Sequence, residues 1–386
     1  MYALFWPMWT PSDRSYAHDV SDSDLPTSSE GDANRGMPPI LEPEKTSPGQ
    51  RIIRIVLTLL LLYLIFGVLI PSFASYQDVW DALTSLDPVT LLFLAALTFV
   101  VEGCKAGAFS LIIEPLRFPD AFVAQESAAV ISNTVPGPSG TAARYVTYRK
   151  FGISTEDFAT SYVVNSSVSN VLPLVMPSIG LVLLATQDDV PGRVWTLALI
   201  GLGVSIVLLV LAVLIMRSEQ FARSFGARLG RFINWVRGMA RRPPGEALGD
   251  TVVKWRSDVV DIFRARALGL VGLFVLREFA TYLILLFSLR GMGVGSDVLT
   301  PIEVFAVYTV VRLATLVEIT PGNVGIAEAL YISALNWAAD GQDADAIVAA
   351  VFVFRMFTYL GPILIGGVCT AILSRRFRRA GTPSAS

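Results

Sequence analysis

Long apolar runs separated by short polar stretches dominate the chain from about residue 52 to residue 373. A helix needs about 20 predominantly apolar residues to cross the hydrocarbon core of a bilayer. Six runs reach or approach that length, and we expect each to form a spanning helix: 52–70, 89–113, 158–186, 194–216, 267–289 and 346–373. The pattern therefore predicts an all-α integral membrane protein with about six spanning helices.

Two further apolar segments, 121–148 and 301–339, are interrupted near the middle by proline and glycine. Both interruptions have the pattern P-G-x-x-G-x-A, which begins at Pro136 in the first segment and at Pro321 in the second. Backbone groups freed by such residues cannot face lipid, so broken helices at membrane depth are buried in protein or line a wet cavity. We predict two re-entrant hairpins, and the matched pair is typical of a transporter with an internal repeat.

Charged residues at the ends of the runs predict how the chain is oriented. Arg51 and Arg54 stand at the head of the first run, and four arginines follow the last run between positions 375 and 379. Cytoplasmic segments are enriched in Lys and Arg, so both termini are expected in the cytoplasm. In this orientation the first hairpin enters from the cytoplasm and the second from outside, which predicts an inverted repeat.

The same pattern predicts three regions. Residues 1–50, rich in Ser, Pro and Asp, are expected to form a disordered cytoplasmic tail, residues 51–375 a polytopic transmembrane domain, and residues 376–386 a basic cytoplasmic tail. Within the domain, residues 217–266 carry eleven Lys or Arg against five Asp or Glu and form a cytoplasmic loop. This loop either lies partly on the anionic inner membrane surface or acts as a topology signal alone.

Composition excludes a soluble protein and several kinds of chemistry. The chain is 53% hydrophobic, with a mean hydropathy of +0.58. Cys104 and Cys369 lie in or beside apolar runs, which favours buried thiols over a disulfide or a metal pair. His18 stands alone in the polar tail. The sequence therefore predicts no metal site, no cofactor and no catalysis by histidine.

Ionisable residues within membrane segments are usually paired or functional. Glu102 and Lys105 lie three positions apart, so they form either a structural pair or part of a substrate path. A guanidinium group matches phosphate or carboxylate, and the arginines expected to bind an anionic headgroup are Arg144, Arg312 and Arg355. Glu318 and Glu328, which flank the second break, would balance this charge. Alternatively, Arg355 pairs with one of these glutamates and ties the repeat together.

Residues at the two breaks complete the candidate substrate site. Half-helices that begin after Gly140 and Gly325 would offer unpaired N–H groups and a positive dipole end to an anion. The other candidates at the breaks are Asn133, Pro136, Pro321 and Gly322. Arg277 and Glu278 are adjacent on a helix and should not face each other, so they receive no role. No nucleophile–base constellation is present, and we predict no catalytic residue.

Two stretches resemble the signatures of a known family. The first is N-T-V-P-G-P-S-G at 133–140, with Arg144-Tyr145 and R-K-F-G-I-S at 149–154; the second is T-P-G-N-V-G-I-A-E at 320–328, with Arg355 in the next span. They look like the motifs of the lysylphosphatidylglycerol synthase transmembrane (flippase-like) family, over about residues 50–375. Where the family usually has Glu, Arg and Gly, this chain has Thr141, Asn165 or Asn170, and Asn323.

The resemblance implies a membrane protein that moves a lipid, either an aminoacylated phosphatidylglycerol or a polyprenyl-phosphate-linked sugar. We therefore expect a translocase for an anionic lipid in a bacterial inner membrane, without the soluble aminoacyltransferase domain and without enzyme activity. Its expected partners are membrane lipids and not nucleic acid. The alternative is a scaffold or regulator that recruits an envelope lipid synthase or glycosyltransferase through the basic loop.

Overall fold

The computed structural model describes residues 84–113, 116–134, 139–187, 192–218, 248–316 and 320–380, together with a few isolated positions between 220 and 231. The predicted tail at 1–50 and the predicted first span at 52–70 lie outside these residues. Most of the basic loop, including 232–247, and the end of the C-terminal tail at 381–386 lie outside them as well.

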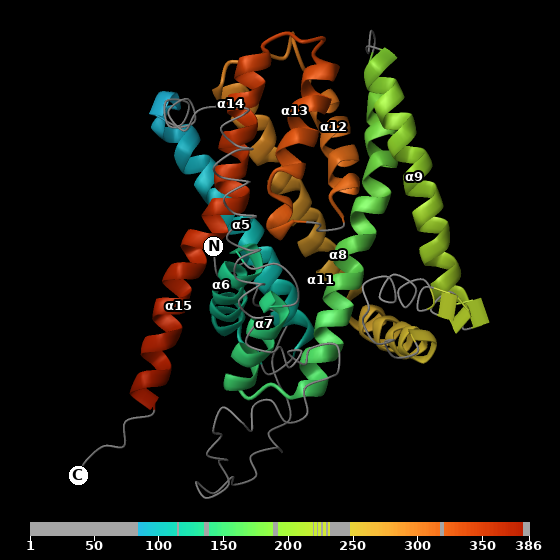
Figure 1. Cartoon of the computed structure of the whole chain (residues 1–386), viewed down its shortest axis with the longest axis vertical. Coiled ribbons are helices and arrows are strands. Elements are labelled where there is room, and N and C mark those ends of the chain that lie inside the picture. The colour runs from blue at the N-terminus through green and yellow to red at the C-terminus, as the bar shows by residue number, and fades with distance from the viewer. Residues whose placement is uncertain are drawn as a thin grey trace, which may run out of the picture. The chain divides into compact units, whose positions relative to one another are not determined.

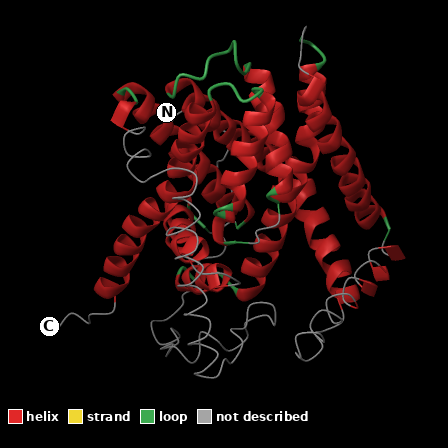
Figure 2. Cartoon of the chain, turned by 45° about the horizontal axis from the view of Figure 1, so that its top comes forward, coloured by secondary structure: helices red, strands yellow, loops and turns green. Residues whose placement is uncertain are grey.

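Every regular element in the described part of the chain is a helix (Figures 1 and 2). The longer helices, in chain order, are α5 Pro88–Ile112, α6 Phe118–Thr134, α7 Ser139–Lys150, α8 Thr155–Leu184, α9 Gly192–Arg217, α11 Leu248–Gly291, α12 Pro301–Ala314, α13 Ile326–Ala338, α14 Ala344–Arg355 and α15 Gly361–Ala380. The prediction of an all-α protein is confirmed for these residues.

Five helices or helical stretches in the described residues are long and apolar enough to cross a membrane: Pro88–Ile112, Thr155–Leu184, Val194–Leu211, Leu268–Gly291 and Ala344–Arg376. They coincide with five of the six predicted spans. Large apolar side chains on them face outward, among them Val89, Val182, Val207 and Leu268, the last of which is 92% exposed. Such a surface suits contact with lipid tails, which do not penalise exposed apolar groups.

The second predicted break is present as an interruption between two short helices, α12 and α13. Residues 135–138 of the first predicted break, between α6 and α7, lie outside the described residues. A short 3₁₀ turn, η2, spans Pro321–Asn323 inside the second break. The four flanking helices contain 17, 12, 14 and 13 residues. Each is too short to cross a bilayer alone, which needs about 20 residues.

The last predicted span contains a feature that hydrophobicity alone does not reveal. Helix α14 passes into a π-helical turn, η3, at Met356–Leu360 before α15 continues the rod. A π turn inserts one extra residue per turn and is frequent at functional sites. Thr358 and Tyr359 of this turn line the central cavity described below.

Two boundaries differ from the sequence prediction. Residues 248–266, which we assigned to the basic loop, form the first part of the 44-residue helix α11. Residues 376–380 of the predicted C-terminal tail extend α15. In both places the charged residues have good helix propensity, so a neighbouring apolar helix continues through them.

Packing brings the two broken segments together. Helix α6 packs against α5, α7 and α15, and it also contacts η2 in the second break. Helix α12 packs against α8, α9 and α13, and α11 runs beside α5, α8 and α14. In Figure 1, α12 and α13 occupy the upper half of this bundle, and α6 and α7 occupy the lower half.

Candidate functional site

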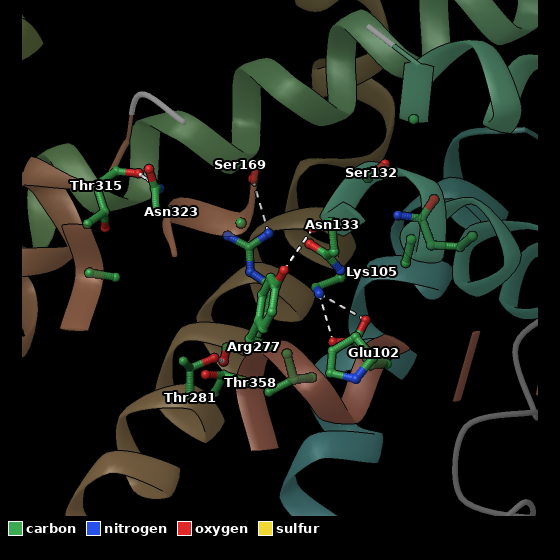
Figure 3. Close-up of a pocket in the computed structure, with 18 of the residues that line it drawn as sticks. Glu102, Lys105, Ser132, Asn133, Ser169, Arg277, Thr281, Thr315, Asn323 and Thr358 are labelled. Carbon is green, nitrogen blue, oxygen red and sulfur yellow. Dashed lines mark hydrogen bonds and ion pairs between the residues drawn. The ribbon is translucent and has the colours of Figure 1, made fainter. Parts of the chain in front are cut away.

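A cavity of about 460 Å³ lies where the two breaks meet. The residues that line it come from α5, α6, α7, α8, α11, α12, η2, α13, α14, η3 and α15 (Figure 3). Most lining side chains are polar or charged, although the surrounding helices are apolar. A polar chamber inside an apolar helical bundle is the arrangement that membrane transporters use near the bilayer midplane.

Gly322, at the second break, lies against the end of the first. Its φ angle is +58°, a conformation that glycine adopts without steric penalty. A Cβ at this position would lie 2.5 Å from Cε2 of Tyr359 and 3.2 Å from Oδ1 of Asn133. The Tyr359 hydroxyl in turn donates a 2.8 Å hydrogen bond to the carbonyl of Asn133. Asn133, Gly322 and Tyr359 therefore join α6, η2 and η3 at one point.

Gly140 also permits a close approach, in this case between the two arms of the first broken segment. A Cβ on Gly140 would lie 2.6 Å from Cβ and 2.7 Å from Cα of Ser132. Since backbone cannot move aside as a flexible side chain does, only glycine fits here. Gly140 also lines the cavity, so the close contact with Ser132 lies at the cavity wall.

Arg355 and Glu328 form an ion pair beside the second break. Nε of Arg355 donates to Oε1 of Glu328 at 2.7 Å, and Nη2 donates to the carbonyl of Gly322 at 2.8 Å. The other carboxylate oxygen of Glu328 accepts the Gly325 N–H at 2.6 Å. The predicted pairing of Arg355 with a glutamate of the break is confirmed for Glu328. Glu328 thus caps its own helix at the Gly325 N–H, while the unpaired N–H groups predicted after Gly325 stay a prediction.

Glu278 is the centre of a second ionic cluster, which the sequence analysis missed. It is buried, at 2% exposure, and accepts hydrogen bonds from Nε of Arg312 at 3.0 Å and from the Tyr308 hydroxyl at 2.7 Å. Nε of Arg277 also donates to Glu278, at 3.1 Å. Nη1 of Arg277 reaches Ser169 on α8 at 3.0 Å (Figure 3).

This cluster corrects one expectation, because Arg277 and Glu278 do interact although they are adjacent on the helix. It also gives Arg312 a partner, Glu278, that was not predicted. Two adjacent charges inside an otherwise apolar run of α11 were the available signal, since buried charges require partners.

Glu102 and Lys105 form the expected pair on α5, with Nζ of Lys105 at 2.7 and 2.8 Å from the two carboxylate oxygens. Glu102 is 1% exposed, and the Lys105 side chain retains 33% exposure. Both residues line the cavity (Figure 3). The pair is thus structural and also part of the cavity wall.

Arg144 differs from the other cationic residues of the cavity. Its guanidinium lies 5.8 Å from the ring centre of Phe109 and 5.9 Å from that of Tyr162, so two aromatic rings hold it in place. Among the described residues no carboxylate pairs with it, and its buried Nε has no hydrogen-bond partner. A fixed arginine with unused donors is well suited to bind an anion.

Among the described residues, five cationic side chains line the cavity: Lys105, Arg144, Arg277, Arg312 and Arg355. Three described carboxylates pair with four of them: Glu102, Glu278 and Glu328. Two positive charges are therefore in excess, one at Arg144 and one in the cluster where Glu278 pairs with two arginines. This electrostatic field favours an anionic ligand.

The structure describes only some of the remaining predicted site residues. Pro136 and Glu318 lie outside the described residues. Pro321 begins η2, and Gly325 precedes α13. Within the described part of the chain, no three His, Cys, Asp or Glu side chains lie together so that they could hold a metal ion.

Comparison with protein families adds a finding that covers most of the chain. The family model of the lysylphosphatidylglycerol synthase transmembrane region matches residues 51–366. The chain belongs to this family. All the cavity residues described above lie within the matched range. The lysylphosphatidylglycerol synthase transmembrane region is a membrane domain often linked to lipid flipping, and it does not include the catalytic domain of the synthase. No curated protein matches this chain significantly.

Proposed function

We propose that this protein is a translocase that moves an anionic lipid across a bacterial inner membrane. The observation that carries the proposal is the cation-rich polar cavity enclosed at the meeting point of two broken segments. The family assignment supports it, because the family is linked to lipid flipping. The outward-facing apolar surfaces of the long helices are consistent with lipid on their outer sides.

We further propose that α6–α7 and α12–α13 are re-entrant hairpins that enter from opposite membrane faces. Their short helices, the interruptions in the middle and the direct contact between α6 and η2 support this arrangement. Positive charges near both ends of the chain support cytoplasmic termini. An inverted repeat would place the site at the interface of two halves that rock against each other, which provides alternating access.

In the proposed mechanism, Arg144 binds the lipid phosphate through its unused donors. Arg277, Arg312 and Arg355 are held by carboxylates, so they shape a positive wall and contribute donors that remain free. The ion pair between Arg355 and Glu328 maintains the second break and thus the cavity itself. Lipid tails would remain at the apolar outer surface while the headgroup passes through the cavity.

Reconstitution tests this function. Purified protein is placed in liposomes, and the appearance of fluorescent phosphatidylglycerol in the outer leaflet is measured. We expect faster exchange than in empty liposomes, reduced at least about tenfold by Arg144→Gln, which corresponds to the loss of about 1.4 kcal/mol in the rate-limiting step. Lys150→Gln is the matched control, because it removes a cationic charge from an exposed position on the same helix.

The scaffold hypothesis makes a different prediction. If the protein recruits an envelope enzyme, deletion of residues 221–245 should release a copurifying synthase or glycosyltransferase while the transmembrane bundle stays folded. Those residues lie mostly outside the described part of the chain. Lack of lipid exchange across a panel of anionic lipids, combined with such a partner, would contradict the translocase.

A further inference from the structure

Among the described residues, the carboxylate that lines the cavity is already paired. This residue is Glu102, and Lys105 binds both of its oxygens. Glu278 and Glu328 are paired with arginines of the lining and are 2% and 4% exposed. Glu126, whose carboxylate oxygens have no hydrogen-bond partner, is fully buried and does not line the cavity. An ammonium group on a ligand is a donor without acceptor capacity, and it needs a negatively charged or strongly accepting partner when it leaves water. The described lining offers it no unpaired carboxylate.

The arginines add a repulsive contribution. Arg144, Arg277, Arg312 and Arg355 all face the same cavity of about 460 Å³. Like charges at short range disfavour binding by amounts that grow as water is excluded. A cationic headgroup would therefore have to displace Lys105 from Glu102 while it also approaches these arginines.

Uncharged hydrogen-bonding groups of α8 also line the cavity. Asn165, Ser166, Ser169 and Asn170 of α8 share one face of that helix, since residues one turn apart point in the same direction. The Oδ1 atom of Asn165 is buried and lacks a hydrogen-bond partner among the described residues. A buried acceptor without a partner is costly, so a ligand hydroxyl that donates to it would be favoured.

Resting on the proposed translocase function, we propose that the cavity selects a phosphate headgroup that carries hydroxyl groups and no amine. Glycerol phosphate and glycosyl phosphate headgroups fit this description, and aminoacylated headgroups do not. Arg144 binds the phosphate, and the polar face of α8 binds the hydroxyls. The described lining offers an ammonium no unpaired carboxylate.

The test compares two lipids that share a phosphatidylglycerol core. Liposomes with the full chain are loaded with fluorescent phosphatidylglycerol or with lysyl-phosphatidylglycerol, and the two exchange rates are measured separately. We expect phosphatidylglycerol to move at least about tenfold faster, which equals a difference of about 1.4 kcal/mol. Equal rates, or faster movement of the lysyl lipid, would overturn the selectivity and leave the translocase intact. No exchange of any lipid would contradict the translocase itself.

Two variants test the stated cause. Asn165→Asp adds a carboxylate of nearly the same shape to the cavity wall. We expect the exchange rate of the lysyl lipid to rise at least about threefold relative to that of phosphatidylglycerol. Asn165→Ala is the control for loss of the amide, and it should slow phosphatidylglycerol without helping the lysyl lipid. A relative gain of the same size in both variants would show that charge does not set the preference.

A second pair of variants uses the existing ion pair. Lys105→Gln frees the Glu102 carboxylate, and we expect it to reduce the ratio of the phosphatidylglycerol exchange rate to the lysyl-phosphatidylglycerol exchange rate. The double variant Lys105→Gln with Glu102→Gln removes that carboxylate, so this ratio should return toward the wild-type value. A Lys105→Gln variant with the wild-type ratio, at normal protein abundance, would overturn the role given to this pair. Addition of free glycerol phosphate distinguishes a soluble ligand from a lipid. Exchange of phosphatidylglycerol should be inhibited only if the headgroup site also binds the soluble ligand.

Discussion

Replacement of Gly322 by alanine is expected to destabilise the junction of the two breaks. Two separate costs apply. A left-handed conformation at a residue with a Cβ costs roughly 1–2 kcal/mol, and Gly322 has a φ angle of +58°. The new Cβ would also lie 2.5 and 2.7 Å from two carbon atoms of the Tyr359 ring. Overpacking of this kind costs about 1–3 kcal/mol, so the total is about 2–5 kcal/mol.

The Tyr359 ring cannot readily move aside. Its hydroxyl is bound to the carbonyl of Asn133 at 2.8 Å, and the guanidinium of Arg355 lies 5.2 Å from the ring centre. Relief of the clash would therefore disturb either the contact with α6 or the arginine beside Glu328. We expect the variant to lose lipid exchange along with stability.

Gly341→Ala is a matched control. Gly341 also has a positive φ, +74°, and a Cβ there would have no atom within 4 Å. Gly341→Ala should lower the free energy of unfolding by about 1–2 kcal/mol, from the backbone conformation alone. Thermal unfolding in detergent, followed by tryptophan fluorescence, compares the two. At about 2–4 °C per kcal/mol, Gly322→Ala should melt roughly 2–12 °C below Gly341→Ala.

A double variant separates the two costs. In a Tyr359→Leu background the ring is absent, so Gly322→Ala should cost no more than Gly341→Ala does. If Gly322→Ala and Gly341→Ala lower the melting temperature equally in the wild-type background, the close contact with Tyr359 does not stabilise the junction and the reasoning is refuted.

Three further predictions concern packing and ion pairs. Gly366→Ala should lower the melting temperature, because a Cβ there would penetrate the backbone carbonyl of Glu126 on α6, while Gly367→Ala, with no atom within 4 Å, should leave it unchanged. Glu278→Gln should lower the free energy of unfolding by about 3–5 kcal/mol, since it leaves buried arginines without their carboxylate. Unchanged denaturation by urea would contradict the stabilising role given to this cluster. Arg355→Gln should abolish exchange and lower the melting temperature together, whereas loss of exchange at wild-type stability would show that this residue only binds substrate.

The apolar runs were sufficient to predict the spanning helices in the described part of the chain. Each run is long and uninterrupted, and a bilayer permits few alternatives to a helix. The breaks were predictable for a related reason, because proline and glycine at positions such as Pro321 and Gly322 interrupt helical hydrogen bonding. The π turn at Met356–Leu360 was not predicted, although Gly361 and Pro362 follow it directly and Pro362 offers no N–H to the helical ladder.

Ion pairing was predictable only in part. Glu328 flanks the second break and Arg355 lies in the next span, so their pairing could be offered as an alternative. The partner of Arg312 lies 34 residues away on another helix, and only the crossing of α11 and α12 brings it close. The unpaired state of Arg144 also depends on tertiary structure, because the two aromatic rings that hold it come from α5 and α8.

The most direct test of the central claim is the exchange of fluorescent phosphatidylglycerol in liposomes that contain wild-type protein, Arg144→Gln or Lys150→Gln at equal abundance. The account predicts fast exchange for wild type and Lys150→Gln, and exchange at least about tenfold slower for Arg144→Gln. Equal rates for all three proteins would contradict the claim that the unpaired arginine of the cavity carries the lipid headgroup.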